Sequence, residues 1–310
     1  MSYELITMGR VGVDLYPDQI GVTLDRVERF NRYLGGTATN VAVAAARYGH
    51  RSAVITKVGD DAFGAYVRRA LEEFGVDPGF VTTHPELRTP IVFCEVHPPD
   101  HFPILFYRQP AAPDVTLTTE ELPLDEIHRA RIFWTTGTGL SVEPSRTATL
   151  AALDAAEGTV VHDLDYRPSL WADPAEAGKW QREALRRATV AVGNLEECSV
   201  AVGDGSPAEM ARRLFELGVE VAIVKQGPEG VTAVIGDREV HAAPVVVDVV
   251  NGLGAGDAFG GALCHGLLEG WDWEEIIPFA NAAGAFVAAQ LACADAMPTE
   301  PEVRELMANA

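Results

Sequence analysis

The sequence predicts an α/β protein with a mostly parallel central sheet, and three observations support this class. From Ile132 onward, short β-branched runs alternate with longer segments of helical pattern, which is typical of strand–helix–strand units. The 310 residues are 47% apolar, which is enough for one large core. Clusters of Gly, Asp and Asn follow several predicted strands, and ligands bind at the carboxyl ends of strands in open parallel sheets.

The first 110 or so residues combine regular elements with two insertions. The regular elements are a strand over 4–8, a helix that opens at Gly35-Gly36 and ends at Gly49, a strand over 52–58 and a helix over 60–75. Residues 15–34 show no helical period, and 89–96 and 104–108 are β-type runs around a proline-stiffened connection. We therefore predict a single domain over 1–310, with a small β-sheet lid formed by insertions at about 11–34 and 88–109.

The rest of the chain supplies the alternating elements. The predicted strands cover 132–136, 159–165, 189–193, 221–225, 231–235 and 239–247, with β-type residues continuing to Val250. The predicted helices cover 144–156, 174–187, 195–202, 207–218, 258–268, 274–291 and 300–308. The last two strands follow each other without a helix between them, so we expect them to be antiparallel.

Charge and cysteine content narrow the class of function. The formal net charge of −21 disfavours nucleic acid and anionic membranes as partners, because both require a basic surface. An anionic substrate must then be attracted by local arginines against the field of the whole chain. The four cysteines are far apart, no apolar run reaches the ~18 residues of a membrane span, and no secretory signal is visible. We therefore expect a cytoplasmic protein with reduced thiols.

The stretch Asn251-Gly-Leu-Gly-Ala-Gly-Asp257 carries the strongest functional signal. Its glycines let the backbone approach a ligand closely, and the helix that follows presents free N–H groups at the positive end of its dipole. Asp257 stands at that helix start, so an anion cradle lies beside a carboxylate. This combination favours phosphoryl transfer, in which the amides stabilise the moving charge and Asp257 accepts a hydroxyl proton.

Other interpretations of this stretch stay open at this point. A glycine-rich turn with Asp at a helix start is often only an N-cap. The chain has no Gly-x4-Gly-Lys-[Ser/Thr] motif, which argues against a P-loop protein, and the late position of the glycines argues against a nicotinamide-dependent dehydrogenase. A non-catalytic sensor on the same fold is a further alternative, although a sensor needs no base in an anion site.

Polar clusters follow several of the predicted strands and helix starts. Each cluster alone could be a turn, a cap or a surface charge. Because the carboxyl ends of parallel strands meet at one edge of a sheet, five clusters there favour a common site. The clusters are Asp14, Gly35-Gly36 with Asn40, Asp163 to Arg167, Asn194 to Glu197, and Lys225 to Gly230.

These motifs, in this order, resemble the ribokinase-like (PfkB) carbohydrate kinases. The resemblance rests on Gly35-Gly36 with Asn40, on Asn194-x-x-Glu197, and on Gly254-Ala-Gly-Asp257-Ala-Phe, and it covers almost the whole chain. It implies a three-layer α/β sandwich with a mostly parallel sheet and a small β-sheet lid that often forms a dimer contact. It also implies transfer of the γ-phosphoryl group of ATP, with Mg²⁺, to a sugar hydroxyl.

The resemblance assigns roles to particular residues. Asp257 is implied as the base, and the amides of Gly254, Ala255 and Gly256 as the anion hole. Asn194 and Glu197 are implied to position Mg²⁺, probably through water. The residues implied to line the nucleotide are Asn194, Lys225, Gly227, Gly230, Gly254, Gly256 and Asn281. The residues implied to hold the sugar are Asp14, Gly35, Gly36 and Asn40, together with Asp257.

Several segments resemble the family members that act on sugar acids. They are 9–17, 98–100, 106–108 and 163–171, and the resemblance implies phosphorylation of 5-dehydro-2-deoxygluconate, probably at C6. Arg108 and Arg167 are expected to bind the substrate carboxylate, because guanidinium groups bind carboxylates bidentately. A 2-keto-3-deoxygluconate kinase, a ribokinase and a fructokinase are the alternatives within the family.

One segment departs from the family pattern. Many members have Asp-Thr-Thr before the Gly-Ala-Gly-Asp motif, and that segment helps to bind a monovalent cation. This chain has Asn251-Gly252-Leu253 there. A potassium site is therefore left undecided, while ATP, Mg²⁺ and a homodimer formed through the lid are expected.

Overall fold

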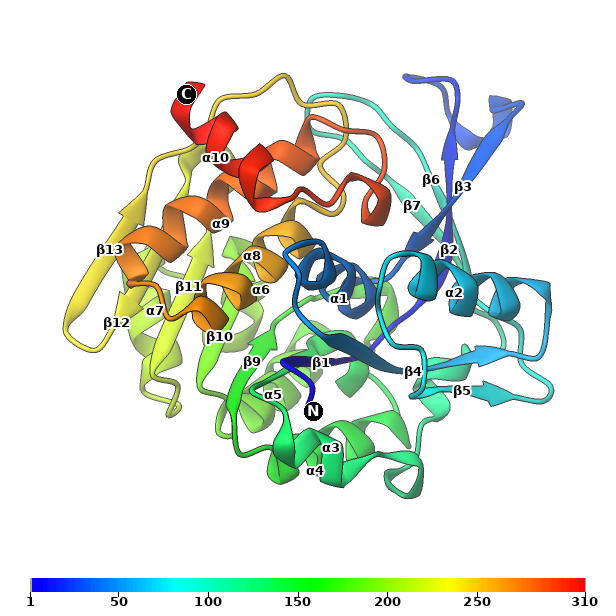
Figure 1. The fold of residues 1–310 in the computed structure, drawn as a ribbon, viewed down its shortest axis with the longest axis horizontal. Coiled ribbons are helices and arrows are strands. Elements are labelled where there is room, and N and C mark those ends of the chain that lie inside the picture. The colour runs from blue at the N-terminus through cyan, green and yellow to red at the C-terminus, as the bar shows by residue number, and fades with distance from the viewer. Residues whose placement is uncertain (1, 310) are drawn as a thin grey trace.

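A nine-stranded sheet forms the centre of the computed structural model, which describes residues 2–309 (Figure 1). Its strand order is β13-β12-β11-β10-β9-β8-β1-β4-β5, parallel from β11 to β5 and antiparallel at β12 and β13. The bounds are β1 Leu5–Met8, β4 Ser52–Gly59, β5 Val81–His84, β8 Ile132–Thr136, β9 Thr159–Asp163, β10 Val190–Asn194, β11 Val221–Lys225, β12 Val231–Ile235 and β13 Arg238–Ala242. The predicted mostly parallel α/β class is confirmed.

Helices cover both faces of this sheet. Successive strand residues point to opposite faces, so Trp134 packs in the core on one side and Phe133 in the core on the other. One side is covered by α1 Thr37–Arg47, α8 Ala255–Glu269, α9 Trp273–Ala288 and α10 Glu300–Asn309, with α2 Ala62–Glu73 packed beside α1. The other side is covered by α3 Leu124–Arg129, α4 Ser145–Ala155, α5 Pro174–Leu185, α6 Leu195–Val202 and α7 Pro207–Phe215.

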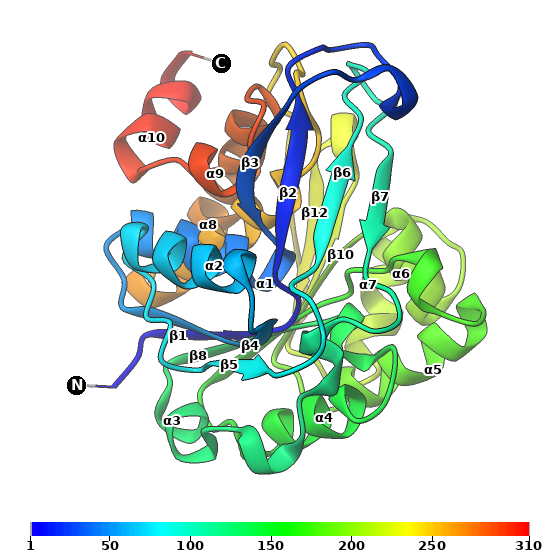
Figure 2. The ribbon, with the colours of Figure 1, turned by 90° about the vertical axis from the view of Figure 1, so that its right-hand side faces the viewer.

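A second, four-stranded sheet stands at the edge of the central one. Figure 2 shows its strands side by side in the order β3 Phe30–Gly35, β2 Gly12–Pro17, β6 Ile91–Cys94 and β7 Ile104–Tyr107. Alternation along the strands gives the sheet two different faces. The inner face presents Asp14, Tyr16, Val92, Cys94, Ile104 and Phe106 to a cavity. The outer face carries Phe30, Phe93, Leu105 and Tyr107, of which Leu105 and Tyr107 are exposed.

Three differences from the predicted elements matter for the site. The predicted strand over 239–247 ends at Ala242, because β12 offers only five residues for pairing and Pro244 has no N–H to donate. The helix predicted to begin at Ala258 begins at Ala255, which places Asp257 inside its first turn. Strand β5 and helix α3 were not predicted. Among residues 2–309, no helix combines the length and apolarity that crossing a membrane requires.

Helices α1 and α8 pack closely enough to bring their two functional ends together. A Cβ atom on Gly261 of α8 would overlap the Cβ of Ala44 on α1, and one on Gly260 would come within 2.6 Å of the Trp134 ring. Glycine is therefore required here for helix contact, although it lowers helix propensity. The contact holds Asn40, near the start of α1, beside Asp257, near the start of α8.

Gly261→Ala is expected to destabilise the protein by about 1–3 kcal/mol, the usual cost of overpacking a core. Ala44→Gly in the same chain removes the opposing methyl group and should recover part of that loss, even though it costs about 0.5–1 kcal/mol alone. Urea unfolding of the two single variants and the double variant measures the coupling between them. Purely additive effects would contradict the close contact.

Candidate active site

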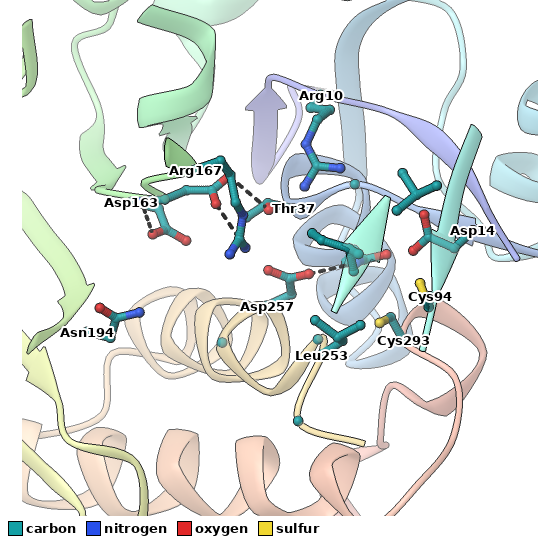
Figure 3. Close-up of a pocket in the computed structure, with 18 of the residues that line it drawn as sticks. Arg10, Asp14, Thr37, Cys94, Asp163, Arg167, Asn194, Leu253, Asp257 and Cys293 are labelled. Atoms are coloured by element: carbon teal, nitrogen blue, oxygen red, sulfur yellow. Dashed lines mark hydrogen bonds and ion pairs between the residues drawn. The ribbon is translucent and has the colours of Figure 1, made fainter. Parts of the chain in front are cut away.

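A cavity lies between the carboxyl ends of the central strands and the inner face of the small sheet, and Figure 3 shows its side chains converging from both. Its walls include the ends of β9, β10 and β11, the loop after β1, and the starts of α1 and α8. The lining residues are Arg10, Asp14, Tyr16, Gly36, Thr37, Asn40, Val92, Cys94, Ile104, Phe106, Asp163, Asp165, Arg167, Asn194, Glu197, Lys225, Gly252, Leu253, Gly254, Gly256, Asp257 and Cys293.

The start of α8 forms one wall of the cavity, and its glycines expose the backbone there. Gly254 precedes the helix with φ of +84°, a conformation that glycine adopts without strain. A Cβ on Gly254 would lie 2.7 Å from the Cys293 sulfur, and a Cβ on Gly256 would lie 3.0 Å from Lys225 Nζ. The first N–H groups of a helix have no intrahelical partner. The sequence therefore folds here into a helix start that suits an anion, with an ammonium group beside it.

Asp257 lies in the first turn of α8 and points into the cavity. Asn40 Nδ2 donates to Asp257 Oδ2 over 2.6 Å and so orients the carboxylate. Burial raises the pKa of Asp257 to about 6, although the hydrogen bond from Asn40 opposes the shift. A carboxylate with a pKa near 6 is ionised at neutral pH and is a stronger base than an exposed Asp.

Asp14 and Asn40 present unused hydrogen-bonding groups on the side nearest the small sheet. Asp14 Oδ1 and Asn40 Oδ1 are buried and have no partner within residues 2–309. Burial raises the pKa of Asp14 to about 6, with the Arg10 charge opposing the shift. A Cβ on Gly35 would overlap the Asp14 carboxylate, so that glycine makes room for the side chain. Buried polar atoms without partners indicate a polar ligand.

Asp165 and Arg167, which follow β9, form an ion pair at the cavity wall. Arg167 Nη2 lies 3.1 Å from Asp165 Oδ1, and Thr37 Oγ1 at the start of α1 donates to Asp165 Oδ2 over 3.0 Å. Burial alone would raise the pKa of Asp165, but the guanidinium groups of Arg167 and Arg10 hold it below its usual value. Arg167 Nε has no partner among residues 2–309, so this guanidinium keeps a donor for a ligand.

A group of acidic side chains surrounds Lys225 at the ends of β9, β10 and β11. Burial raises the pKa of Asp163 to about 8, with Lys225 opposing the shift and Glu197 adding to it. Burial alone would lower the pKa of Lys225, but Asp163, Glu197 and Asp257 outweigh it and hold the pKa above its usual value. Lys225 therefore stays charged beside the helix start of α8.

Asn194 and Glu197 form a capping box at the start of α6. Glu197 N–H donates to Asn194 Oδ1 over 2.9 Å, and Asn194 N–H donates to Glu197 Oε2 over 2.7 Å. Both residues also line the cavity, and no hydrogen bond from residues 2–309 reaches the second Glu197 oxygen. Carboxylate and amide oxygens, with Asp163 nearby, suit Mg²⁺ held partly through water. The residues present fit that ion.

Several predicted site residues lie outside the cavity lining. Arg108 is engaged by the Asp114 carboxylate, at 2.8 and 3.0 Å. Asn281 donates to the Ala243 carbonyl over 2.8 Å and anchors the loop after β13. Gly35 and Ala255 are chain neighbours of lining residues, and Gly227 and Gly230 form the turn after β11. The nucleotide roles of Asn281 and of this turn stay predictions.

Four lining residues were not expected at the site from the sequence, namely Arg10, Thr37, Cys94 and Cys293. Asp163 and Asp165 were expected there only as members of a polar cluster, and Tyr16 only as a ring that could pack on the sugar's carbon chain. Cys94 could have been found from strand alternation, since it lies two residues from Val92 on β6 and both line the cavity. Arg10 directly follows the first strand, at the edge where the polar clusters were expected. Cys293 carried no local signal, because a loop after α9 brings it to within 3.0 Å of the Tyr16 hydroxyl.

Comparison with known proteins shows the family to which the chain belongs. A family model described as pfkB family carbohydrate kinase matches residues 4–300. The chain belongs to this family of carbohydrate kinases. The family predicted from the sequence motifs is therefore confirmed, and so is the assignment as a phosphotransferase that acts on a sugar.

Individual relatives of this pfkB kinase cover nearly its whole length. It is 32% identical to a 5-dehydro-2-deoxygluconokinase from Clostridium perfringens over 99% of this chain and 93% of that protein. It is 34% identical to a 5-dehydro-2-deoxygluconokinase from Photobacterium profundum over 96% of this chain and 92% of that protein. A double mutant of a fructokinase from Vibrio cholerae O395, solved with fructose, ADP and a potassium ion, has a TM-score of 0.88 at 25% identity and covers 98% of both chains.

If Asp257 is the base that the sequence motifs predict, its pKa determines how the activity of this kinase depends on pH. A base works only when deprotonated, and the protonated form of Asp257 predominates below about pH 6. We expect kcat/KM to be level above about pH 7 and to fall about tenfold per pH unit well below pH 6. Asp14, with a pKa also near 6, can make the fall steeper. Steady-state rates from pH 5 to 8.5 measure this, and a level profile down to pH 5 would contradict it.

Proposed function

We propose that this kinase transfers the γ-phosphoryl group of ATP to the C6 hydroxyl of 5-dehydro-2-deoxygluconate. The observation that carries the reaction type is the position of Asp257, which Asn40 orients at an anion-binding helix start beside Lys225. The substrate is supported by the names of the two relatives above, which share about a third of their residues with this chain. The cationic groups of Arg10 and Arg167 in the cavity suit a sugar acid.

In this mechanism one proton moves to Asp257, one oxygen–phosphorus bond forms and one breaks. Asp257 accepts the proton of the sugar hydroxyl, whose oxygen attacks the γ-phosphorus. A new oxygen–phosphorus bond forms as the bond to the β-phosphate oxygen breaks, and ADP leaves. The N–H groups of Gly254, Ala255 and Gly256 and the Lys225 ammonium stabilise the charge on the transferred group. Magnesium, held by Asn194 and Glu197 through water, would neutralise further phosphate charge when bound.

The substrates occupy two ends of the site in this proposal. The phosphates lie toward Asn194 and Lys225, and the rest of the nucleotide lies along the turn with Gly227 and Gly230 toward Asn281. The sugar lies under the small sheet, between Asp14, Asn40 and Asp257, with Gly35 and Gly36 shaping the wall. Closure of the small sheet would exclude water, which competes as an acceptor.

Asn251 anchors the loop before α8 through two hydrogen bonds of its side chain. Asn251 Nδ2 donates to the Leu291 carbonyl over 2.7 Å, and Asn251 Oδ1 accepts from Leu253 N–H over 3.1 Å. These bonds hold the segment that the family resemblance connects with potassium. The mechanism above assigns no role to a monovalent cation, and the potassium site stays undecided.

The outer face of the small sheet supports a homodimer as part of the proposal. Leu105 and Tyr107 are 47% and 60% exposed and lie beside Phe93. Covering such an apolar face with a second copy removes it from water. Sedimentation velocity of the Leu105→Glu variant tests this, and an unchanged sedimentation coefficient would count against a contact at this face.

A substrate panel tests the proposed function. ADP release is measured with 5-dehydro-2-deoxygluconate, 2-keto-3-deoxygluconate, D-ribose and D-fructose, each with Mg-ATP. We expect the highest kcat/KM on 5-dehydro-2-deoxygluconate, and phosphorus–proton coupling in the product's NMR spectrum should place the phosphate on C6. A higher kcat/KM on any of the other three would replace the proposed substrate.

A further inference from the structure

Arg10 is buried in the cavity without a partner for its charge. Arg10 lies in the loop after β1, is only 8% exposed, and lines the cavity. No hydrogen bond or ion pair from residues 2–309 engages its guanidinium, and its Nε is buried without an acceptor. The other two arginines considered for substrate binding differ, since Arg108 is paired with Asp114 and Arg167 with Asp165.

Burying the Arg10 guanidinium in this way costs free energy unless a ligand supplies the missing hydrogen-bond acceptors. A buried charge that makes no hydrogen bond and no close ion pair recovers only part of the hydration it loses. The Arg10 guanidinium lies over the Phe106 ring, whose centroid is 5.3 Å away, and a cation–π contact replaces only a small part of that hydration. The guanidinium has five N–H donors in a planar fork, which suits an acceptor with two oxygens such as a carboxylate.

The neighbouring carboxylates are not close partners of the Arg10 guanidinium. The Arg10 charge acts on both Asp14 and Asp165, but neither lies within 4.0 Å of it as an ion pair. Asp165 is already held by Arg167 and Thr37. In Figure 3 the Arg10 guanidinium extends toward the space that Thr37, Asp14 and Asp257 also face. Donors of Arg10 are thus open toward the place where the sugar would lie.

The backbone of Arg10 is fixed even though its side chain has no partner. A Cβ on Gly36 would overlap the Arg10 carbonyl oxygen, so the start of α1 packs directly on this loop. Thr39 Oγ1 also donates to that oxygen over 3.5 Å. The loop is therefore held from the α1 side, and binding an anion requires little ordering of the chain.

We propose that Arg10 binds the carboxylate of the sugar-acid substrate and selects sugar acids over neutral sugars. This inference rests on the proposed function. In 5-dehydro-2-deoxygluconate the carboxylate and the C6 hydroxyl are at opposite ends of the carbon chain. With C6 at Asp257 and the phosphates toward Lys225, the carboxylate lies away from the phosphates, toward the wall that Arg10 forms. Arg167 lines the same cavity and its Nε has no partner among residues 2–309, so it could add a second donor.

Binding measurements separate this role from others. Calorimetric titration gives the Kd of 5-dehydro-2-deoxygluconate and, separately, of Mg-ATP for the wild-type kinase and for Arg10→Met. We expect sugar-acid binding to weaken by about 10- to 150-fold in Arg10→Met, the usual effect of losing a charged hydrogen-bonding partner. The Kd of Mg-ATP should change less than about twofold. The Kd of the sugar acid for Arg10→Lys should lie between the values for the wild-type kinase and Arg10→Met, because lysine keeps the charge without the planar guanidinium.

Each outcome has a distinct meaning. Equal weakening of sugar-acid and Mg-ATP binding, or unchanged sugar-acid binding, would overturn the inference. If Arg108→Met weakens sugar-acid binding while Arg10→Met does not, the carboxylate belongs to Arg108 as the sequence predicted. Failure of the wild-type kinase to bind or phosphorylate the sugar acid would instead remove the proposed substrate. Should Arg10→Met fold poorly, Arg10→Gln, which keeps hydrogen-bond donors without the charge, replaces it in the same titrations.

Discussion

Replacing Asp257 with Asn is expected to lower kcat by about 10²–10⁴-fold, the usual contribution of a positioned general base. The change keeps the shape of the side chain, and the amide oxygen can still accept the hydrogen bond from Asn40. Sugar and nucleotide binding should therefore survive, so the loss should appear in kcat while KM changes little. Because burial disfavours the charged carboxylate, the melting temperature should stay the same or rise.

Asp272→Asn provides the matched control for this variant. Asp272 precedes α9, is exposed, and makes no side-chain cap hydrogen bond, so the same chemical change there should leave kcat unaltered. Rates, KM values and melting temperatures are measured for both variants. Retention of more than about a tenth of the wild-type kcat by Asp257→Asn would show that another group accepts the proton.

The fold could be predicted from local patterns because those patterns repeat. Strands β8, β11 and β12 begin and end at the predicted residues, and each is a short run of mostly β-branched residues with a clear boundary. The run after Ala242 has the same composition but no partner strand, so it forms a loop. Pairing is a property of the sheet rather than of the segment, and the sequence pattern could not show it.

The part of the site built from glycine and acidic motifs could be predicted from the sequence. The arginine that binds the substrate could be predicted less well, because its role depends on a single side chain and its neighbours. Asp257, Asn40 and Lys225 meet at the cavity because each begins or ends an element at the same edge of the sheet. Arg108 was expected at the sugar because of its charge, but its partner Asp114, only six residues away, already engages it. Arg10 was overlooked although it has no such partner. The charge of an arginine in the sequence indicates that it could bind an anionic substrate. Only its neighbours in the structure show whether its guanidinium is already paired.

Replacing Lys225 with Met is expected to lower kcat/KM for ATP by about 10- to 150-fold, because a charged partner of the phosphates is lost. The ammonium lies 3.0 Å from where a Cβ on Gly256 would be, beside the anion-binding helix start. The variant should also change the pH profile. Lys225 opposes the raised pKa values of Asp163 and Asp257, so its removal should raise both further.

The sign of that change in the pH profile follows from the proposed role of Asp257 as the base. A higher pKa means that Asp257 is protonated up to a higher pH, so the acid limb of kcat/KM should move to higher pH in Lys225→Met. Lys179→Met, at an exposed position on α5, is the matched control and should keep the wild-type profile. An acid limb that stays in place while the rate falls would mean that Lys225 acts on the phosphates alone. An unchanged rate and profile would remove Lys225 from the proposed mechanism.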